Sequence, residues 1–303
     1  MTWPTVWSAI TRHAQARVDA VVRDSTQVGF DETVMSPAKR HRRRRFITAA
    51  VDVTDGRIID VFDGRNANDL TGWLDEQPVE WVAGIKVISL DPHEGYRTAV
   101  NHCKALAQVT MVVDPFHIVR LAGQAVTKCR QRVQQTTLAR RGWKGDPLYG
   151  IRKLLLMGAE HLDEHGWQRL RRALDDGDPT GEVQDAWVAR EYVRDVYLTD
   201  DPAEAEVALD RALAWCRDRD AGPELRTLAK TLTRWRTEIL AHHTTGASNG
   251  RVEAANLLLK QIKRAGRGFR SLRNYRLRIL LAGGCQRHAP LVTRHRPRPS
   301  FIA

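Results

Sequence analysis

The chain has 303 residues, a formal net charge of +12 and a pI of about 10.0. No apolar run is long enough to span a bilayer, the N-terminus has no signal-peptide pattern, and the four cysteines form no C-x-x-C pair. We therefore expect neither a membrane protein nor a disulfide framework or zinc knuckle. The absence of a membrane span and of a signal peptide indicates a cytoplasmic protein. The strong basic charge indicates a nucleic-acid partner.

The first segment, residues 1–27, is predicted to be mainly one helix. Apolar residues such as Ile10 and Val18 recur on one helical stripe between Trp3 and Val22. Asp24 then interrupts the pattern. This helix is too short to form a domain of its own.

Three strands follow and are predicted to form an antiparallel meander. The basic run KRHRRRR at 39–45 connects the first two strands, and Thr54-Asp55-Gly56-Arg57 is a hairpin turn between the last two. A helix over 68–77, capped by Asn66 or Asn68, comes next. The three strands occupy residues 28–35, 46–53 and 58–62.

A strand–helix–strand unit occupies the next part of the chain. Residues 85–90 and 109–113 are short, non-alternating apolar runs, which is typical of buried parallel strands. Asp91 and Asp114 follow these strands directly. Ligands bind at the carboxyl ends of the strands in open α/β sheets. The order of the strands places Asp31, on the first strand, beside Asp91.

A structural role explains the same two aspartates. Asp91-Pro92 and Asp114-Pro115 both suit the N-cap and first residue of a helix. Glu94 could complete a capping box with Asp91. Both interpretations stay open from these residues alone.

The rest of the chain is predicted to be almost entirely helical. We expect an α/β protein with a mixed sheet, whose core is interrupted by an all-helical insertion at 142–244. The tryptophans of this region are expected to belong to its core. The tail at 285–303, rich in Arg and Pro, is expected to be disordered. Predicted helices cover residues 117–137, 154–157, 167–174, 184–197, 203–217, 224–242, 246–264 and 269–281.

The helix over 246–264 carries an acid in a basic segment. Between Arg251 and Arg298, Glu253 is the one acid among about thirteen Lys and Arg residues. Metal ligation explains such an isolated acid, and so does an ordinary ion pair with Arg251 or Lys260. Asn249, Asn256 and Lys260 share a face of the helix with Glu253.

Three acids from separate elements suit an enzyme that cuts polynucleotides. Two divalent ions about 4 Å apart assist in-line attack at a phosphodiester. Mg²⁺ prefers a few carboxylates together with water and phosphate oxygens. Asp31, Asp91 and Glu253 could converge as such a set.

Four blocks carry a resemblance to a known family. VGFDETVM, VISLDPHEGY, VVDPFHIVRLA and SNGRVEAANLLLKQIKRAGRGFRSL resemble successive blocks of bacterial insertion-sequence transposases. The closest similarity is to the ISL-three family of DDE transposases, from about residue 28 to 284. The resemblance implies an RNase H-like core, with parts at 28–141 and 245–284, interrupted by the helical insertion.

The resemblance also implies the site residues. By motif position the catalytic and metal-binding acids are Asp31, Asp91 and Glu253. Asp114 remains an alternative second acid, but we prefer Asp91 because its strand is expected to lie next to that of Asp31. Glu32, Asp52 and His93 are near enough in sequence to bind metal or support its ligands. The expected supporting residues are Asp114, His117, Asn249 and Asn256.

The implied reaction is metal-dependent phosphoryl transfer on double-stranded DNA. The protein would hydrolyse DNA at the transposon ends, and each freed 3′-hydroxyl would attack target DNA, with two Mg²⁺ or Mn²⁺ ions and no covalent protein intermediate. Two ends must be held together, so we expect a homo-oligomer associated with the bacterial nucleoid. The residues expected to bind the phosphate backbone are Arg42, Arg43, Arg44, Arg45, Lys260, Lys263, Arg264, Arg267 and Arg270.

The N-terminal part departs from the family. Its members usually carry an N-terminal zinc-binding and helix-turn-helix region, whereas the helix in residues 1–27 could be a remnant of one. The alternative function is therefore a truncated, non-catalytic DNA-binding relic or a regulator of transposition.

Overall fold

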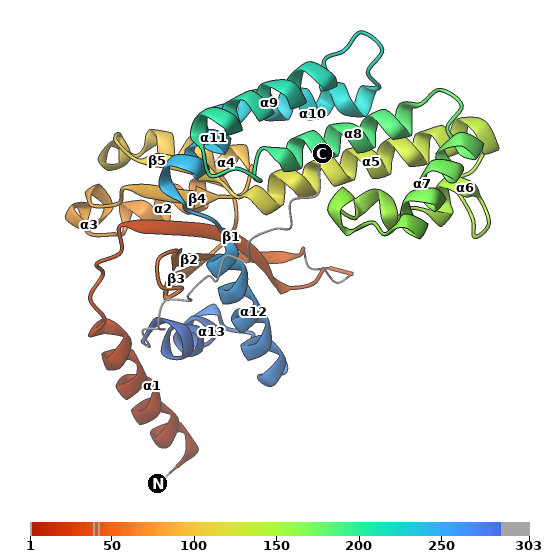
Figure 1. Ribbon diagram of the computed structural model, residues 1–303. Coiled ribbons are helices and arrows are strands. Elements are labelled where there is room, and N and C mark those ends of the chain that lie inside the picture. Colours follow the sequence, from red (N-terminus) through yellow and green to blue (C-terminus); the bar gives the residue numbers. More distant parts are fainter. Residues whose placement is uncertain (1, 39, 42, 286–303) are drawn as a thin grey trace. The chain divides into compact units, whose positions relative to one another are not determined.

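The structure, a computed structural model, describes residues 2–38, 40–41 and 43–285 (Figure 1). Arg42 and the tail beyond Cys285, which was expected to be disordered, lie outside the described residues. The chain forms two compact units, one of residues up to 89, 93–109 and from 249 onwards, the other of residues 90–92 and 110–248. None of the described helices combines the length and apolar character needed to cross a membrane.

One five-stranded sheet has the order β3-β2-β1-β4-β5. Strands β1, β2 and β3 pair antiparallel in sequence, which confirms the predicted meander. Asp114, directly after β5, donates its backbone N–H to the carbonyl of Leu90, the last residue of β4, at 3.2 Å. The carboxyl ends of β4 and β5 therefore lie together, as in a parallel pair, and the sheet is mixed. The strands are β1 (Gln27–Ser36), β2 (Arg45–Asp52), β3 (Ile58–Asp63), β4 (Val87–Leu90) and β5 (Thr110–Val113).

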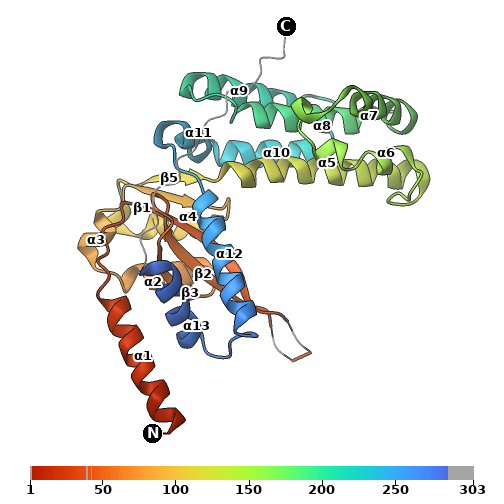
Figure 2. The same ribbon diagram turned by 60° about the horizontal axis from the view of Figure 1, so that its bottom comes forward.

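Helices cover both faces of the meander in the first unit. On one face, Ile47, Ala49 and Val51 form a buried core with apolar residues of α12 and α13. Figure 2 shows α12 lying against β1 and β2, which it contacts. On the opposite face, Phe30 of β1 meets the ring of Trp73 on α2 edge to face. The helices of this unit are α1 (Trp3–Asp19), α2 (Ala67–Asp75), α3 (Val79–Ala83), α4 (Glu94–His102), α12 (Gly250–Ala265) and α13 (Leu272–Ile279).

The helix caps resolve two of the open sequence interpretations. Asn66 caps α2 in a capping box with Asp69, so Asn68 does not. The residue at the N-cap of α4 is His93, whose backbone is extended. The predicted Asp91–Glu94 capping box is therefore wrong, because α4 begins two residues after the position that such a box requires.

Asp114 does cap the next helix. It is the N-cap of α5, and its carboxylate accepts the backbone N–H of His117 at 3.3 Å. The capping interpretation is thus confirmed for Asp114, and this role keeps its carboxylate next to His117.

The second unit is a layered bundle of helices. The Arg132 guanidinium of α5 forms ion pairs with Glu182 at 2.5 Å and Glu224 at 2.9 Å, which ties α5 to α8 and α10. Helix α11 packs against β5. The helices are α5 (Pro115–Leu138), α6 (Pro147–Gly150), α7 (Glu164–Gly177), α8 (Glu182–Asp195), α9 (Pro202–Cys216), α10 (Pro223–Arg234) and α11 (Arg236–Thr245), with single 3₁₀ turns at Leu154–Leu156 and Ala159–His161.

Two sequence predictions for this unit were wrong. The single helix over 224–242 is divided at Trp235, whose backbone leaves the helical region at φ −104° and ψ 15° while its side chain is buried. Trp143, predicted to belong to the core, is 70% exposed. Its neighbour Arg140 places a guanidinium 5.2 Å from the ring centroid.

Candidate metal centre and nucleic-acid interface

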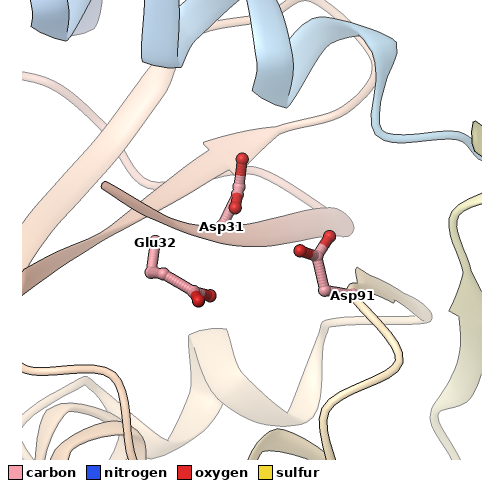
Figure 3. A group of neighbouring side chains, drawn as sticks. All are labelled: Asp31, Glu32 and Asp91. Atoms are coloured by element: carbon pink, nitrogen blue, oxygen red, sulfur yellow. The ribbon is translucent and has the colours of Figure 1, made fainter. Parts of the chain in front are cut away.

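Acidic side chains gather where β1 lies beside β4. Asp31 lies in the middle of β1, and Asp91 directly follows β4, the next strand in the sheet. Asp31, Glu32 and Asp91 each offer a carboxylate oxygen, and these three atoms lie within 4.8 Å of one another (Figure 3). The sheet thus brings together the first two acids that the sequence predicted.

The spacing of these oxygens is close to what a small cation requires. Mg²⁺ binds oxygens at about 2.0–2.1 Å, so two ligands on opposite sides of the ion are about 4.2 Å apart. The oxygens of the three acids lie within 4.8 Å of one another, so small side-chain rotations would bring them to the spacing of ligands on one ion. All three residues offer hard carboxylate oxygens and are half-buried, so the donor set fits Mg²⁺ or Mn²⁺.

Glu32 differs from the other two acids in its direction and its partner. Successive residues of a strand point to opposite faces, and Figure 3 shows Asp31 and Glu32 leaving β1 on different sides. The Glu32 carboxylate lies 3.6 Å from the Arg65 guanidinium. Glu32 is therefore balanced by a cation of the chain itself.

His117 holds the second acid from the other side. Its Nδ1 lies 2.9 Å from Asp91 Oδ1 and 2.9 Å from Asp114 Oδ2. Burial disfavours the charged imidazole, but the hydrogen bonds to Asp114 and Asp91 outweigh it and raise the pKa of His117 to about 9. An imidazolium thus stands between two carboxylates that would otherwise repel each other.

Helix α12 approaches β1 closely beside the first acid. A Cβ on Gly29 would lie 2.4 Å from the Val252 side chain, so only glycine allows this approach. Asn256, buried on α12, donates its side-chain amide to Asp31 Oδ2. Asn249, at the N-cap of α12, is also buried.

The structure places the remaining predicted residues as follows. Glu253 lies in the first turn of α12 and is exposed, outside the group of three acids that the structure brings together. Asp52 accepts hydrogen bonds from the backbone and the side chain of Thr54, in a turn. His93 packs on Tyr96 with ring centroids 5.3 Å apart. Asp52 and His93 thus serve local structure, and neither belongs to the group of three acids.

Basic side chains from two loops line one cavity of the first unit. Arg43, Arg44 and Arg45, before and at the start of β2, share a cavity of about 350 Å³ with Arg270, in the loop after α12. Arg45 forms a two-pronged pair with Asp63, at 2.9 and 2.7 Å, whereas the other three arginines are exposed. Lys263 donates to the backbone carbonyl of Val34. Among the other predicted DNA contacts, the exposed ones are Lys260, Arg264 and Arg267.

Comparison with known proteins adds the deciding observation. A family model described as transposase, of the DDE type named after ISL3, matches residues 28–279. The chain belongs to the ISL-three family of DDE transposases. The match spans β1 to α13, so it includes all the acids discussed above.

Two relatives within the insertion-sequence transposases illustrate the similarity. The transposase for insertion sequence element IS1001 of Bordetella parapertussis is 25% identical over 279 residues, covering 91% of this chain. The transposase for element IS1557 of Mycobacterium tuberculosis is 26% identical over 294 residues, covering 89% of this chain. The matches span 66% and 63% of these relatives' own lengths.

Proposed function

We propose that this chain carries the catalytic core of an insertion-sequence transposase. The core would cleave DNA strands at the element's ends and join the freed 3′-hydroxyls to target DNA in metal-dependent phosphoryl transfers. The observation that carries this proposal is the proximity of Asp31, on β1, and Asp91, directly after the neighbouring strand β4, in a member of this family. Their carboxylate oxygens lie within 4.8 Å of each other.

Asp31, Asp91 and Glu253 would hold two Mg²⁺ or Mn²⁺ ions. Bound metal would supply a Lewis acid that activates the attacking oxygen and stabilises the leaving oxygen. His117 would keep Asp91 in place through its contact at 2.9 Å, and Asp114 would orient His117 from the other side.

Glu253 would be the third acid of the site. Glu253 lies one helical turn before Asn256, whose amide contacts Asp31, so the two residues share a face of α12. Its position in the S-N-G-R-V-E block matches that of the family's third acid. Glu32 is a weaker candidate, because it leaves the other face of β1 and pairs with Arg65.

DNA would bind the basic cavity and the outer face of α12. Arg43, Arg44 and Arg270 are exposed guanidiniums around one cavity, a pattern that suits contact with a phosphate backbone. The remaining proposed contacts are Arg42, Arg45, Lys260, Lys263, Arg264 and Arg267. A homo-oligomer would bring two transposon ends together.

The architecture that we propose is an RNase H-like core with a helical insertion. Residues 28–141 and 245–284 would form the core, and residues 142–244 the insertion. Support comes from the β3-β2-β1-β4-β5 order of the mixed sheet, and from the packing of α12 on β1 and β2 despite their distance in sequence. The helix within residues 1–27 would precede the core.

Cleavage of labelled, pre-nicked DNA tests the proposal. We expect the wild type to cut the DNA in Mg²⁺ or Mn²⁺ and to stop when EDTA is added. The Asp31→Asn variant should not cut under the same conditions. DNA binding without metal-dependent cleavage would overturn the catalytic proposal and favour a DNA-binding relic or regulator of transposition.

A further inference from the structure

Polar residues of α12 follow β1 along its length. Asn249, Asn256 and Lys263 are spaced by seven residues, two helical turns, and so lie on one stripe of the helix. In that order they meet β1 at Gly29, at the Asp31 carboxylate and at the carbonyl of Val34. The helix therefore runs along the strand, and its middle contact falls on the proposed first metal ligand.

The middle contact is made by a buried amide with one unused atom. Asn256 is 4% exposed, and its Nδ2 donates to Asp31 Oδ2. Its Oδ1 is buried with no hydrogen-bond partner among the residues that the structure describes. A reversed amide would bring two acceptors together, so the carboxylate of Asp31 itself fixes this orientation.

Stability alone would not select asparagine at this position. A buried carbonyl oxygen without a donor destabilises a folded protein, and the neighbouring buried positions of α12 hold Val252, Ala255 and Leu259. A lysine could also reach a carboxylate, but its positive charge would compete with a bound cation. A neutral amide restrains the carboxylate and leaves its negative charge for a metal.

We propose that Asn256 is a positioning residue for metal binding. Its hydrogen bond to Oδ2 restrains the Asp31 carboxylate and thereby fixes the direction in which this carboxylate meets the cation. This inference rests on the proposed function, since it assumes that Asp31 binds metal.

A matched amide elsewhere in the same unit provides the control. Gln77 is also buried, its Nε2 donates to the carbonyl of Trp73 at 2.7 Å, and its Oε1 is buried without a partner among the described residues. Asn256→Leu and Gln77→Leu therefore remove similar groups from similar surroundings. The two amides differ in their acceptors, because Asn256 donates to a proposed metal ligand and Gln77 donates to a backbone carbonyl.

The experiment measures Mn²⁺ affinity and thermal unfolding for both variants. Free Mn²⁺ is titrated by electron paramagnetic resonance, and unfolding is followed by circular dichroism in EDTA. Because loss of a group that orients a metal ligand typically weakens metal affinity about 10–100-fold, we expect at least about a tenfold loss for Asn256→Leu. Gln77→Leu should bind Mn²⁺ like the wild type, and Asn256→Leu should melt no lower than Gln77→Leu.

The outcomes separate this inference from the proposed function. If Asp31→Asn binds Mn²⁺ as tightly as the wild type, the metal site itself is wrong. If Asp31→Asn loses affinity while Asn256→Leu keeps it, only the role of Asn256 is overturned. A loss of affinity in Asn256→Leu that follows a drop in melting temperature would also overturn that role. Asn256→Ala removes the same donor with less steric demand. We expect it to lose Mn²⁺ affinity like Asn256→Leu, and an Asn256→Ala protein that keeps wild-type affinity would also overturn the role of Asn256.

Discussion

At the scale of single residues, the proposed site depends on balanced charges. Asp91 and Asp114 both lie 2.9 Å from the Nδ1 of His117, and Asp114 and His117 are buried. Removing one member of such a group leaves buried charge without compensation, which costs more than the intact group contributes. We therefore expect His117 to stabilise the folded chain as well as to restrain Asp91.

The first prediction concerns the removal of this imidazole. Because breaking a buried ion pair typically costs about 3–5 kcal/mol, His117→Ala should lower the free energy of unfolding by about 3 kcal/mol in urea denaturation at pH 6. The control is His102→Ala, at an exposed histidine at the end of α4. A surface change of this kind should stay within about 0.5 kcal/mol. Equal effects of the two substitutions would contradict the buried charge pairing.

The same group predicts how stability depends on pH. The pKa of His117 is raised to about 9 in the folded chain, above its usual value, so its charge stabilises the fold fully at low pH. That contribution is lost as the pH rises through about 9. In EDTA, the free energy of unfolding of the wild type should therefore fall more between pH 7 and pH 10 than that of His117→Ala. Parallel curves for the two proteins would contradict this assignment.

At the scale of elements, sequence patterns predicted what local interactions determine. The ends of the five strands fall within two residues of those predicted, because short apolar runs and turn residues mark them. The start of α4 was missed because Asp91-Pro92 suits a helix that begins two residues earlier. The break at Trp235 was missed because tryptophan does not normally interrupt a helix. The sequence also left open whether Asn66 or Asn68 caps α2, because either asparagine can serve as a cap.

The second prediction tests that cap. Asn66 accepts the backbone N–H of Asp69, and the Asp69 side chain accepts that of Asn66. Since loss of an N-cap side chain typically costs about 1 kcal/mol, Asn66→Ala should lower the free energy of unfolding by about that amount. Asn68→Ala, at the second residue of the helix, should change the free energy of unfolding little. Urea denaturation decides between them, and a larger effect for Asn68→Ala would contradict the observed cap.

The candidate site was predictable in part for the same physical reasons. The strand order predicted that Asp31 and Asp91 lie close together, because neighbouring strands bring their residues together. The contact of Asn256 with Asp31 joins residues 225 positions apart. Helical spacing predicted that Asn256 shares a helix face with Glu253, but it could not predict this contact. The position of Glu32 relative to Asp91 depends on side-chain directions that sequence periodicity does not determine.

At the scale of the whole molecule, the net charge of +12 is concentrated in particular segments. Arg43, Arg44 and Arg270 come from loops far apart in the sequence but line one cavity. Contacts with DNA phosphates release bound counterions, so the affinity falls as salt increases. The number of such contacts can therefore be read from the salt dependence.

The third prediction concerns this basic cavity. Each lost phosphate contact lowers the salt slope by about 0.9, so Arg43→Gln, Arg44→Gln and Arg270→Gln together should reduce the slope by about 2 to 3. The measurement is fluorescence anisotropy with duplex DNA across a range of salt concentrations. The control removes the same charge from exposed arginines of α7, by Arg169→Gln, Arg171→Gln and Arg172→Gln. An equal reduction by the control would contradict a localised DNA surface.

The most direct test of the whole account is single-turnover cleavage of pre-nicked DNA in Mg²⁺. It compares the wild type with Glu253→Gln and Glu32→Gln. Loss of a metal ligand should cost more than the roughly 10–100-fold typical of the residues that support one, so Glu253→Gln should slow cleavage by at least about 100-fold. Glu32→Gln should retain most of the wild-type rate. Cleavage that survives Glu253→Gln but is lost in Glu32→Gln would contradict the proposed set of catalytic acids.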